Sequence, residues 1–390
     1  MAFYGSVEPL LPREGRPELD DAAFELVREA SSLAGQLPEV VVEGVGDLVR
    51  SMNCYYSNLI EGHPTLPRDI ERAMAEEYSA EPIQRDLQLE ARAHIEVQRM
   101  IDTGQDPKSD PVSPEYILWL HRSFCERLPE SLLWVENPDT GERLRVEPGE
   151  FRRNPVKVGR HIPPGPEELN NAMRRFEEGY TGSISKFRKV VAVAAAHHRL
   201  LWIHPFLDGN GRVARLLSHA MFRRLEIGNS LWAVSRGLAR QVADYKRLLQ
   251  AADQPRTSDL DGRGNLSEGA LAEFCEFFLL SSVDQVRYMR SILEPSTLIR
   301  RLELYCAEEH DAGRLPATAF PILRESVLAG EVPRSQVPGL IQLKERAARN
   351  VTATLLKSGL LVSDHSRSSL RLGFPLHAVE RWFPALYPAG

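Results

Sequence analysis

One segment constrains the fold of this chain more than any other: residues 204–215, which read HPFLDGNGRVAR. Its two glycines, Gly209 and Gly211, allow positive φ angles and let a ligand approach the main chain closely. Apolar residues recur at helical spacing from Arg212 onward, and an Ala-rich helical pattern precedes His204. The segment therefore predicts two helices joined by a glycine-rich turn. This argues against a dinucleotide fingerprint of the G-x-G-x-x-(G/A) type, which has to follow a strand.

The turn has the properties of an anion site. A glycine-rich turn that enters a helix points free N–H groups and a partial positive charge at one place. Arg212 and Arg215 are three residues apart and share one face of the first helical turn. Cations oppose the dipole at a helix N-terminus, and a bound anion such as a triphosphate would explain them. We therefore expect Gly209, Asn210 and Gly211, with both arginines, to bind phosphates.

Two reactive side chains come just before this anion site in the sequence. Asp208 comes just before the glycines, and a carboxylate beside bound phosphates is the usual way to hold Mg²⁺. The unperturbed pKa of His204, near 6.5, suits proton transfer at neutral pH. Such parts serve phosphoryl-type transfer, where positioning and charge stabilisation dominate. Singly these signals are weak, since a histidine at the end of an apolar helix is more often structural. The whole pattern is far more specific.

Composition sets broad bounds. With 390 residues, 43% hydrophobic and 26% charged, the chain is typical of a globular protein of two or three domains. A net charge of −6 gives no global attraction to nucleic acid. The four cysteines lack metal or redox spacing, so we expect reduced thiols. No apolar run approaches ~18 residues and the first residues are not typical of a signal peptide. We therefore expect a cytoplasmic protein without a membrane span.

Periodicity and turn residues predict a mainly α fold. Helices are expected at residues 20–37, 42–59, 65–78, 82–103, 114–128, 167–180, 187–202, 212–225, 239–252 and 268–293. Residues 134–151 are expected to form a loop or hairpin, and the alternation of Val156 and Val158 predicts a second short hairpin within residues 154–164.

The pattern changes beyond Pro295. Helices near residues 297–309 and 319–328 are followed by residues 335–340 and a helix at 344–358. Two β-like runs, 360–362 and 370–372, flank a polar tip. Helix, turn, helix and hairpin resemble a winged helix-turn-helix. We therefore predict three parts: an N-terminal helical region at 1–106, a helical core at 107–294 and a winged-helix-like domain at 295–390.

The central segment resembles the HPFx(D/E)GNGRxxR motif of Fic-domain proteins, with every motif position filled. That family transfers a nucleoside monophosphate, usually AMP from ATP, to a hydroxyl group of a target protein. The resemblance implies a Fic helical core with a short β-hairpin flap. It also implies a Mg²⁺-dependent protein adenylyltransferase, with Mn²⁺ as an alternative metal. His204 would be the base, Asp208 the metal ligand and ATP the substrate.

A second stretch, Ser57-Asn-Leu-Ile-Glu61-Gly62, resembles the family's (S/T)xxxE(G/N) inhibitory motif. Ser57 and Glu61 are four residues apart, so one helix face carries both. In the family the glutamate pairs with the second arginine of the main motif, here Arg215, which would otherwise meet the γ-phosphate. An Arg–carboxylate pair is strong and geometrically demanding. The resemblance thus implies autoinhibition by Glu61, although S-x-x-x-E-G alone is common.

Three further features carry predictions. The segment between Val156 and Ile162 resembles the family's flap, which holds a target protein by strand addition. Tyr245 lies where the family often places an aromatic residue near the adenine, with a core tyrosine as the alternative. His197 resembles a conserved position of the family that we interpret as structural.

Alternatives stay open at this point. The enzyme could use UTP or GTP, or it could hydrolyse AMP from a modified protein with Glu61 orienting water. A third alternative is a DNA-binding regulator in which the core acts as a sensor.

The third alternative depends on residues 296–390. The helix at 344–358 has four basic residues and one acid, and two arginines lie on or beside the tip: Lys344, Arg346, Arg349, Lys357, Glu345, Arg367 and Arg371. A recognition helix with a wing uses such groups on DNA. The competing interpretation is a domain that packs on the core or pairs two subunits, so a homodimer also stays open.

Overall fold

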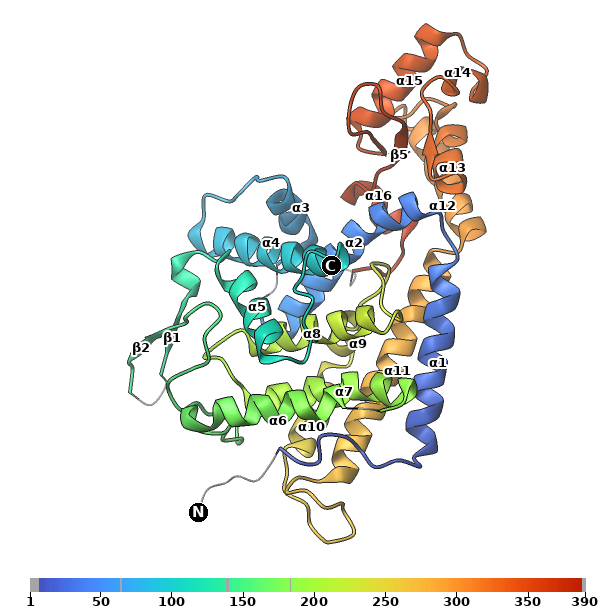
Figure 1. The fold of residues 1–390 in the computed structure, drawn as a ribbon. Coiled ribbons are helices and arrows are strands. Elements are labelled where there is room, and N and C mark those ends of the chain that lie inside the picture. Colours follow the sequence, from blue (N-terminus) through green and yellow to red (C-terminus); the bar gives the residue numbers. More distant parts are fainter. Residues whose placement is uncertain (1–6, 64, 138–139, 183, 388–390) are drawn as a thin grey trace. The chain divides into compact units, whose positions relative to one another are not determined.

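The computed structural model describes residues 7–63, 65–137, 140–182 and 184–387 (Figure 1). The ends of the first and last predicted domains, residues 1–6 and 388–390, lie outside the described residues. The chain divides into two compact units. Unit 1 comprises residues up to Ala30, Asn53–Asn229 and Ala233–Gln285, and unit 2 comprises Ser31–Met52, Ser230–Trp232 and the residues from Val286 on. The three predicted domains stay a prediction.

Unit 1 is mainly helical. Its elements, some of which begin or end in unit 2, are α1 (Pro17–Ala34), α2 (Glu39–Glu61), α3 (Pro67–Met74), α4 (Pro82–Asp102), α5 (Pro114–Cys125), η1 (Glu130–Leu132), β1 (Trp134–Glu136), β2 (Arg143–Arg145), η2 (Pro166–Glu168), α6 (Leu169–Thr181), α7 (Lys186–Ile203), α8 (Asn210–Arg224), α9 (Ser235–Arg240), α10 (Val242–Ala252) and α11 (Glu268–Ile292). Helices α3, α4 and α5 each begin with proline, whose fixed φ suits the first helical position.

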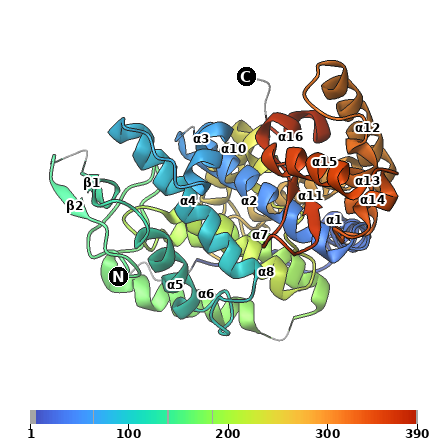
Figure 2. The same ribbon diagram turned by 90° about the horizontal axis from the view of Figure 1, so that it is seen from above.

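Helix α7 forms the centre of unit 1, and it packs against α8 and α6 (Figure 2). Residues 190–200 are buried without interruption, so α7 is a core helix on every side. Its alanines allow close approach of neighbouring helices. His197 joins α7 to two of them, because Nδ1 lies 2.9 Å from the Ser218 hydroxyl and Nε2 lies 2.8 Å from that of Tyr245. The geometry agrees with a structural role for His197.

The small sheet of unit 1 differs in position from the predicted flap. Strands β1 and β2 pair antiparallel, with Val135 opposite Leu144, inside the expected hairpin region. The second hairpin, expected within residues 154–164, is reduced to a single bridge between Val158 and His161. Prolines at positions 155, 163 and 164 explain the difference, because proline lacks the N–H that a strand ladder needs. The predicted strand character there was therefore too extensive.

Two helix predictions also differ from the structure. The helix expected at 65–78 ends at Met74, and Glu76 has a φ of 61° outside the helical region. The helix expected at 239–252 is split into α9 and α10 at Gln241. Neither break follows a proline or glycine, so the sequence carried no strong signal for it.

Unit 2 contains the C-terminal elements. They are α12 (Pro295–Asp311), α13 (Ala319–Leu328), β3 (Glu331–Val332), α14 (Val337–Leu340), α15 (Glu345–Lys357), β4 (Leu361–Val362), β5 (Leu370–Leu372) and α16 (Leu376–Trp382). The strands form an antiparallel sheet in the order β3-β5-β4. Trp382 of α16 is fully buried against Tyr305 of α12. Strand β3 and helix α16 were not predicted, and the winged-helix interpretation stays a prediction.

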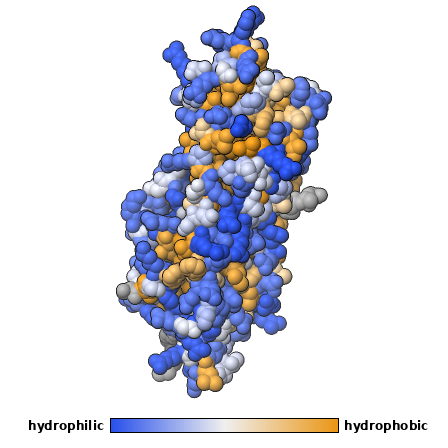
Figure 3. All heavy atoms as spheres, turned by 90° about the vertical axis from the view of Figure 1, so that its right-hand side faces the viewer, coloured by the Kyte–Doolittle hydropathy of each residue, from blue (hydrophilic) through white to orange (hydrophobic). Residues whose placement is uncertain are grey.

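None of the helices in the described part of the chain is long and apolar enough to cross a membrane. On the face drawn in Figure 3, hydrophobic residues are interspersed with hydrophilic ones.

Four buried histidines generate a prediction about stability. Burial lowers the pKa of His94 and His197 to about 3 and that of His121 to about 4, and it lowers the pKa of His198 as well. In the unfolded chain these side chains titrate near 6.5. Between these values the unfolded state binds more protons than the folded state, so stability falls as the pH falls.

We therefore expect a lower free energy of unfolding at pH 5.5 than at pH 7.5, on the order of 1 kcal/mol for each histidine. Urea unfolding followed by tryptophan fluorescence measures this difference. The chosen window lies above the usual pKa of carboxyl groups, near 4. Equal stability at both pH values would contradict the burial of neutral histidines.

Candidate functional site

The side chain of Asn210 closes the turn between α7 and α8. Its carbonyl oxygen accepts a hydrogen bond from the Phe206 N–H at 3.0 Å, and its amide donates to the Phe206 carbonyl at 2.9 Å. The Phe206 ring in turn stacks on His121, with centroids 3.8 Å apart. Because these bonds occupy the Asn210 side chain, a nucleotide contact from this residue would use its backbone N–H.

Glycine is needed at the two positions of the turn for different physical reasons. Gly209 precedes α8 with a φ of 81°, a conformation that L side chains rarely adopt. Gly211 is needed for space, because a Cβ there would lie 2.2 Å from Oε1 of Glu61. The Glu61 carboxylate therefore sits directly against the first turn of α8, where the sequence predicted an anion site.

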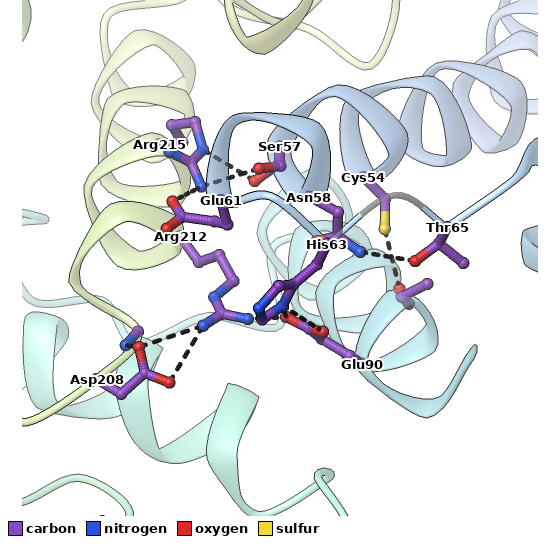
Figure 4. A network of polar contacts seen from close by, with 12 residues as sticks. Cys54, Ser57, Asn58, Glu61, His63, Thr65, Glu90, Asp208, Arg212 and Arg215 are labelled. Atoms are coloured by element: carbon purple, nitrogen blue, oxygen red, sulfur yellow. Dashed lines mark hydrogen bonds and ion pairs between the residues drawn. The ribbon is translucent and has the colours of Figure 1, made fainter. Parts of the chain in front are cut away.

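Arg215 is held by both residues of the predicted inhibitory motif (Figure 4). Its Nε donates to the Ser57 hydroxyl at 2.8 Å, and its Nη2 donates to Oε1 of Glu61 at 2.6 Å. The Arg215 side chain is 1% exposed and that of Glu61 is 29% exposed. Burial alone would raise the pKa of Glu61, but Arg215 and Arg212 outweigh it and hold that pKa below its ordinary value. The predicted contact between Glu61 and Arg215 is present.

Arg212 lies on the same helix face and has different partners. One terminal nitrogen forms an ion pair with Glu90, and the other lies 3.4 Å from both carboxylate oxygens of Asp208. The guanidinium carbon lies 5.1 Å from the centroid of the Phe124 ring. Burial lowers the pKa of Arg212 to about 10, so the side chain is still charged at neutral pH. Its Nε is buried and has no hydrogen-bond partner among the described residues, so one donor remains for a ligand.

Sequence reasoning missed Glu90 and its neighbour His63. Glu90 lies on α4 and is 1% exposed, and its Oε2 lies 3.1 Å from Nδ1 of His63. The sequence did contain an indication of a buried polar site, because Glu90 and His94 interrupt the apolar face of α4 at helical spacing. A buried carboxylate is rare unless it is paired, and its partner Arg212 is far away in the sequence.

His204 ends α7 in a left-handed conformation, with a φ of 51°. Its Nδ1 lies 3.3 Å from the carbonyl oxygen of Leu201. Because a carbonyl oxygen only accepts, Nδ1 carries the proton, and the lone pair of Nε2 makes no hydrogen bond with any described residue. Burial lowers the pKa of His204 to about 4. At neutral pH this imidazole is uncharged and able to accept a proton.

Arg152 links His204 to the segment that is predicted to form the flap. Its Nε donates to the His204 carbonyl at 2.8 Å, and its terminal nitrogens donate to the carbonyls of Asn154 and Pro164. His161 Nε2 lies 2.7 Å from the Trp202 carbonyl of α7. The segment between Val156 and Ile162 is thus tied to the same end of α7 as His204.

The remaining predicted nucleotide contact, Tyr245, lies in the core. It is 2% exposed and its hydroxyl is 2.8 Å from Nε2 of His197. Burial raises its pKa. The packing matches the alternative of a core tyrosine, and the adenine contact stays a prediction.

Asp208 is the residue that could take part in binding a metal. Its Oδ1 accepts a hydrogen bond from the Gly209 N–H at 2.6 Å, and its side chain is 48% exposed. Desolvation of the carboxylate raises its pKa. Within the described residues, no group of three or more His, Cys, Asp or Glu side chains could hold a metal ion. One carboxylate fits a Mg²⁺ ion that takes its other ligands from phosphates and water.

The buried pair of Glu90 and Arg212 gives a prediction about stability. Glu90→Gln keeps the shape of the side chain but removes the buried carboxylate that pairs with Arg212, and it leaves only the longer contact with Asp208 among the described ion pairs of that arginine. Breaking a buried pair costs about 3–5 kcal/mol. As a control, Glu96→Gln changes a 29% exposed carboxylate on the same helix that pairs with Arg92 and Arg127, for which we expect a loss of less than about 1 kcal/mol for each pair. Urea unfolding at pH 7.5 compares the two, and equal losses would argue against the special role of Glu90.

Part of the chain is similar to known proteins. Residues 111–222 match the model of the Fic/DOC family. A stretch of 80 residues is 51% identical to "Protein adenylyltransferase Fic" from Drosophila erecta, and it makes up 20% of this chain and 16% of that protein. The corresponding protein of Drosophila melanogaster is also 51% identical over 80 residues. The chain thus matches a small share of the length of these curated relatives.

Solved structures resemble a larger part of the chain. A Fic family protein from Desulfovibrio desulfuricans has a TM-score of 0.52 at 17% identity, covering 94% of this chain and 98% of its own. A fragment of Fic-1 from C. elegans has a TM-score of 0.50 at 17% identity, covering 72% and 73%. At such identities the likeness shows the fold alone. The match over residues 111–222 shows a Fic/DOC-type domain in that part of the chain, and the structural likeness agrees with the fold of a Fic family protein.

Proposed function

We propose that the protein is an adenylyltransferase that moves AMP from ATP to a hydroxyl side chain of a target protein. The observation that carries the proposal is the placement of an uncharged His204 and a phosphate-type anion site at the two ends of one short turn. Relatives named protein adenylyltransferase support the same activity.

The proposed binding mode uses the first turn of α8. The backbone N–H groups at Gly209 to Gly211 and the unpaired Nε of Arg212 would bind phosphate oxygens. A Mg²⁺ ion at Asp208 would neutralise phosphate charge when bound. Because Arg215 is deeply buried, it requires an anionic partner, and the terminal phosphate of ATP can serve as that partner.

The proposed chemical step begins at His204. Its Nε2 accepts the proton of the target hydroxyl, and the oxygen attacks the α-phosphorus. A new O–P bond forms while the bond from the α-phosphorus to the bridging oxygen breaks, and pyrophosphate leaves. A hydrogen bond from Nδ1 to the Leu201 carbonyl keeps the Nε2 lone pair available. The low pKa of His204 keeps it in the base form throughout the neutral range.

Glu61 supplies the proposed control. While Glu61 occupies Arg215, the terminal phosphate lacks its partner and ATP takes an unproductive pose. The pKa of Glu61 is depressed, so the carboxylate stays charged, and the ion pair intact, until the pH falls below that value. The inhibition is therefore expected to persist at neutral pH.

The target would dock beside His204 along the segment between Val156 and Ile162. Val158 is 41% exposed and Ile162 is 71% exposed on a segment that Arg152 anchors. An extended target chain could pair with this backbone, a mode that tolerates many sequences.

The test compares Glu61→Gly with wild type for self-modification by ATP and Mg²⁺, measured by mass spectrometry as addition of AMP. We expect at least a tenfold rise, equivalent to about 1.4 kcal/mol. Glu43→Gly, at an exposed glutamate of the same helix, is the matched control and should leave activity unchanged. Adding His204→Ala to Glu61→Gly should lower transfer by ~10²–10⁴-fold, and removal of Mg²⁺ should abolish it.

Different failures have different meanings. If Glu61→Gly is no more active than wild type, the inhibitory role is wrong. If the His204→Ala combination retains transfer, another base acts. Faster transfer from UTP or GTP than from ATP would show that ATP is not the preferred substrate. Release of AMP from a modified protein, without forward transfer, would show that the enzyme removes AMP instead of adding it.

A further inference from the structure

Unit 2 carries an exposed basic helix face that the proposed transfer reaction does not use. Helix α15 buries Ala348, Val351, Thr352 and Leu355 and exposes its opposite side. The exposed residues, including the residue before the helix, are Lys344, Glu345, Arg346, Ala347, Arg349, Asn350, Ala353, Thr354 and Lys357. Hydrophilic side chains project at the upper end of the view in Figure 3, the end at which Figure 1 labels α14 and α15.

The elements around α15 form a concave surface. The short helix α14 precedes α15 through residues 341–344, and the hairpin of β4 and β5 carries a tip at residues 363–369. A cavity of about 460 Å³ lies between α14, α15 and Ser366 of the tip, and Arg334 and Arg349 both line it. The helix and the tip therefore border a single groove, whose charged lining residues are Arg334, Arg349 and Glu345.

The segment that forms this surface is opposite in charge to the chain as a whole. Residues 331–372 contain seven Arg and Lys residues and three Asp and Glu residues, whereas the whole chain has a net charge of −6. Glu345 pairs with Arg349 and Asp364 pairs with Arg371. Four exposed cations form no ion pair within the described residues: Lys344, Arg346, Lys357 and Arg367. An unpaired basic surface of this kind fits a polyanion.

The shape of the face favours duplex DNA among polyanions. An α-helix with its side chains is about 10–12 Å across, and the major groove of B-DNA is about 12 Å wide. Ala347 and Ala353 at the centre of the face let the helix approach base edges, while Asn350 and Thr354 supply short polar groups. Arg346 and Lys357 lie toward opposite ends of the helix, where phosphate contacts fix orientation.

We propose that unit 2 binds duplex DNA, with α15 in the major groove and the tip at residues 363–369 on the sugar–phosphate backbone. The proposal is independent of the transfer reaction, because none of its residues belongs to the Fic site.

The experiment uses the full-length protein and a fluorescein-labelled duplex of mixed sequence, with binding followed by fluorescence anisotropy between 20 and 200 mM salt. Affinity should fall steeply with salt, because each neutralised phosphate contributes a slope of about −0.9. Arg346→Ala with Lys357→Ala should weaken binding at least tenfold and reduce the salt slope by about 2. The matched control is Arg247→Ala with Arg263→Ala, two exposed arginines of unit 1 with the same change in charge, and it should change affinity less than twofold.

Several outcomes would overturn the proposal. One is the absence of binding at the lowest salt, and another is equal weakening by the control pair. Single-stranded DNA that binds as tightly as duplex would contradict insertion into the major groove. Displacement of the duplex by polyglutamate at equal charge would indicate an acidic protein surface instead. Circular dichroism of each variant shows that it is folded.

Discussion

The site depends on one constraint, the burial of the Arg215 guanidinium. Its side chain is 1% exposed, so water cannot solvate this charge, and removal of the carboxylate that pairs with it would cost about 3–5 kcal/mol. An anion beside Arg215 at the first turn of α8 is therefore strongly favoured over an empty position. In the structure that anion is Glu61, and Gly211 provides the space for it. A phosphate that enters the same place competes directly with this carboxylate.

The two arginines of the turn differ in how firmly their carboxylates are held. Glu61 is the last residue of α2, it is partly exposed, and Gly62 follows with a φ of 84°. Such a side chain can leave without unfolding a helix. Glu90 lies inside α4 and is 1% exposed, so it cannot move away from Arg212 at similar cost. One pair therefore suits a regulated contact, and the other suits a permanent support.

The sequence predicted correctly those features that depend on residues close together in the chain. The glycine-rich turn, the helices on either side and the spacing of Ser57 and Glu61 follow from short-range rules of periodicity and conformation, and the contact with Arg215 is present. The sequence did not predict the pairing of Glu90 with Arg212, since it joins helices far apart in the chain. The hairpin predicted at residues 154–164 was too extensive. That prediction used the alternation of apolar residues and did not allow for three prolines, which lack the N–H group that strand pairing needs.

The central claim is that Glu61 occupies the position of the terminal phosphate at Arg215. The most direct measurement compares the Kd of ATP with that of ADP by isothermal titration calorimetry, in wild type and in Glu61→Gly. In wild type the two nucleotides should bind about equally, because Arg215 is already paired. In Glu61→Gly the preference for ATP should rise at least tenfold, about 1.4 kcal/mol. An unchanged ratio of the two Kd values would contradict the account.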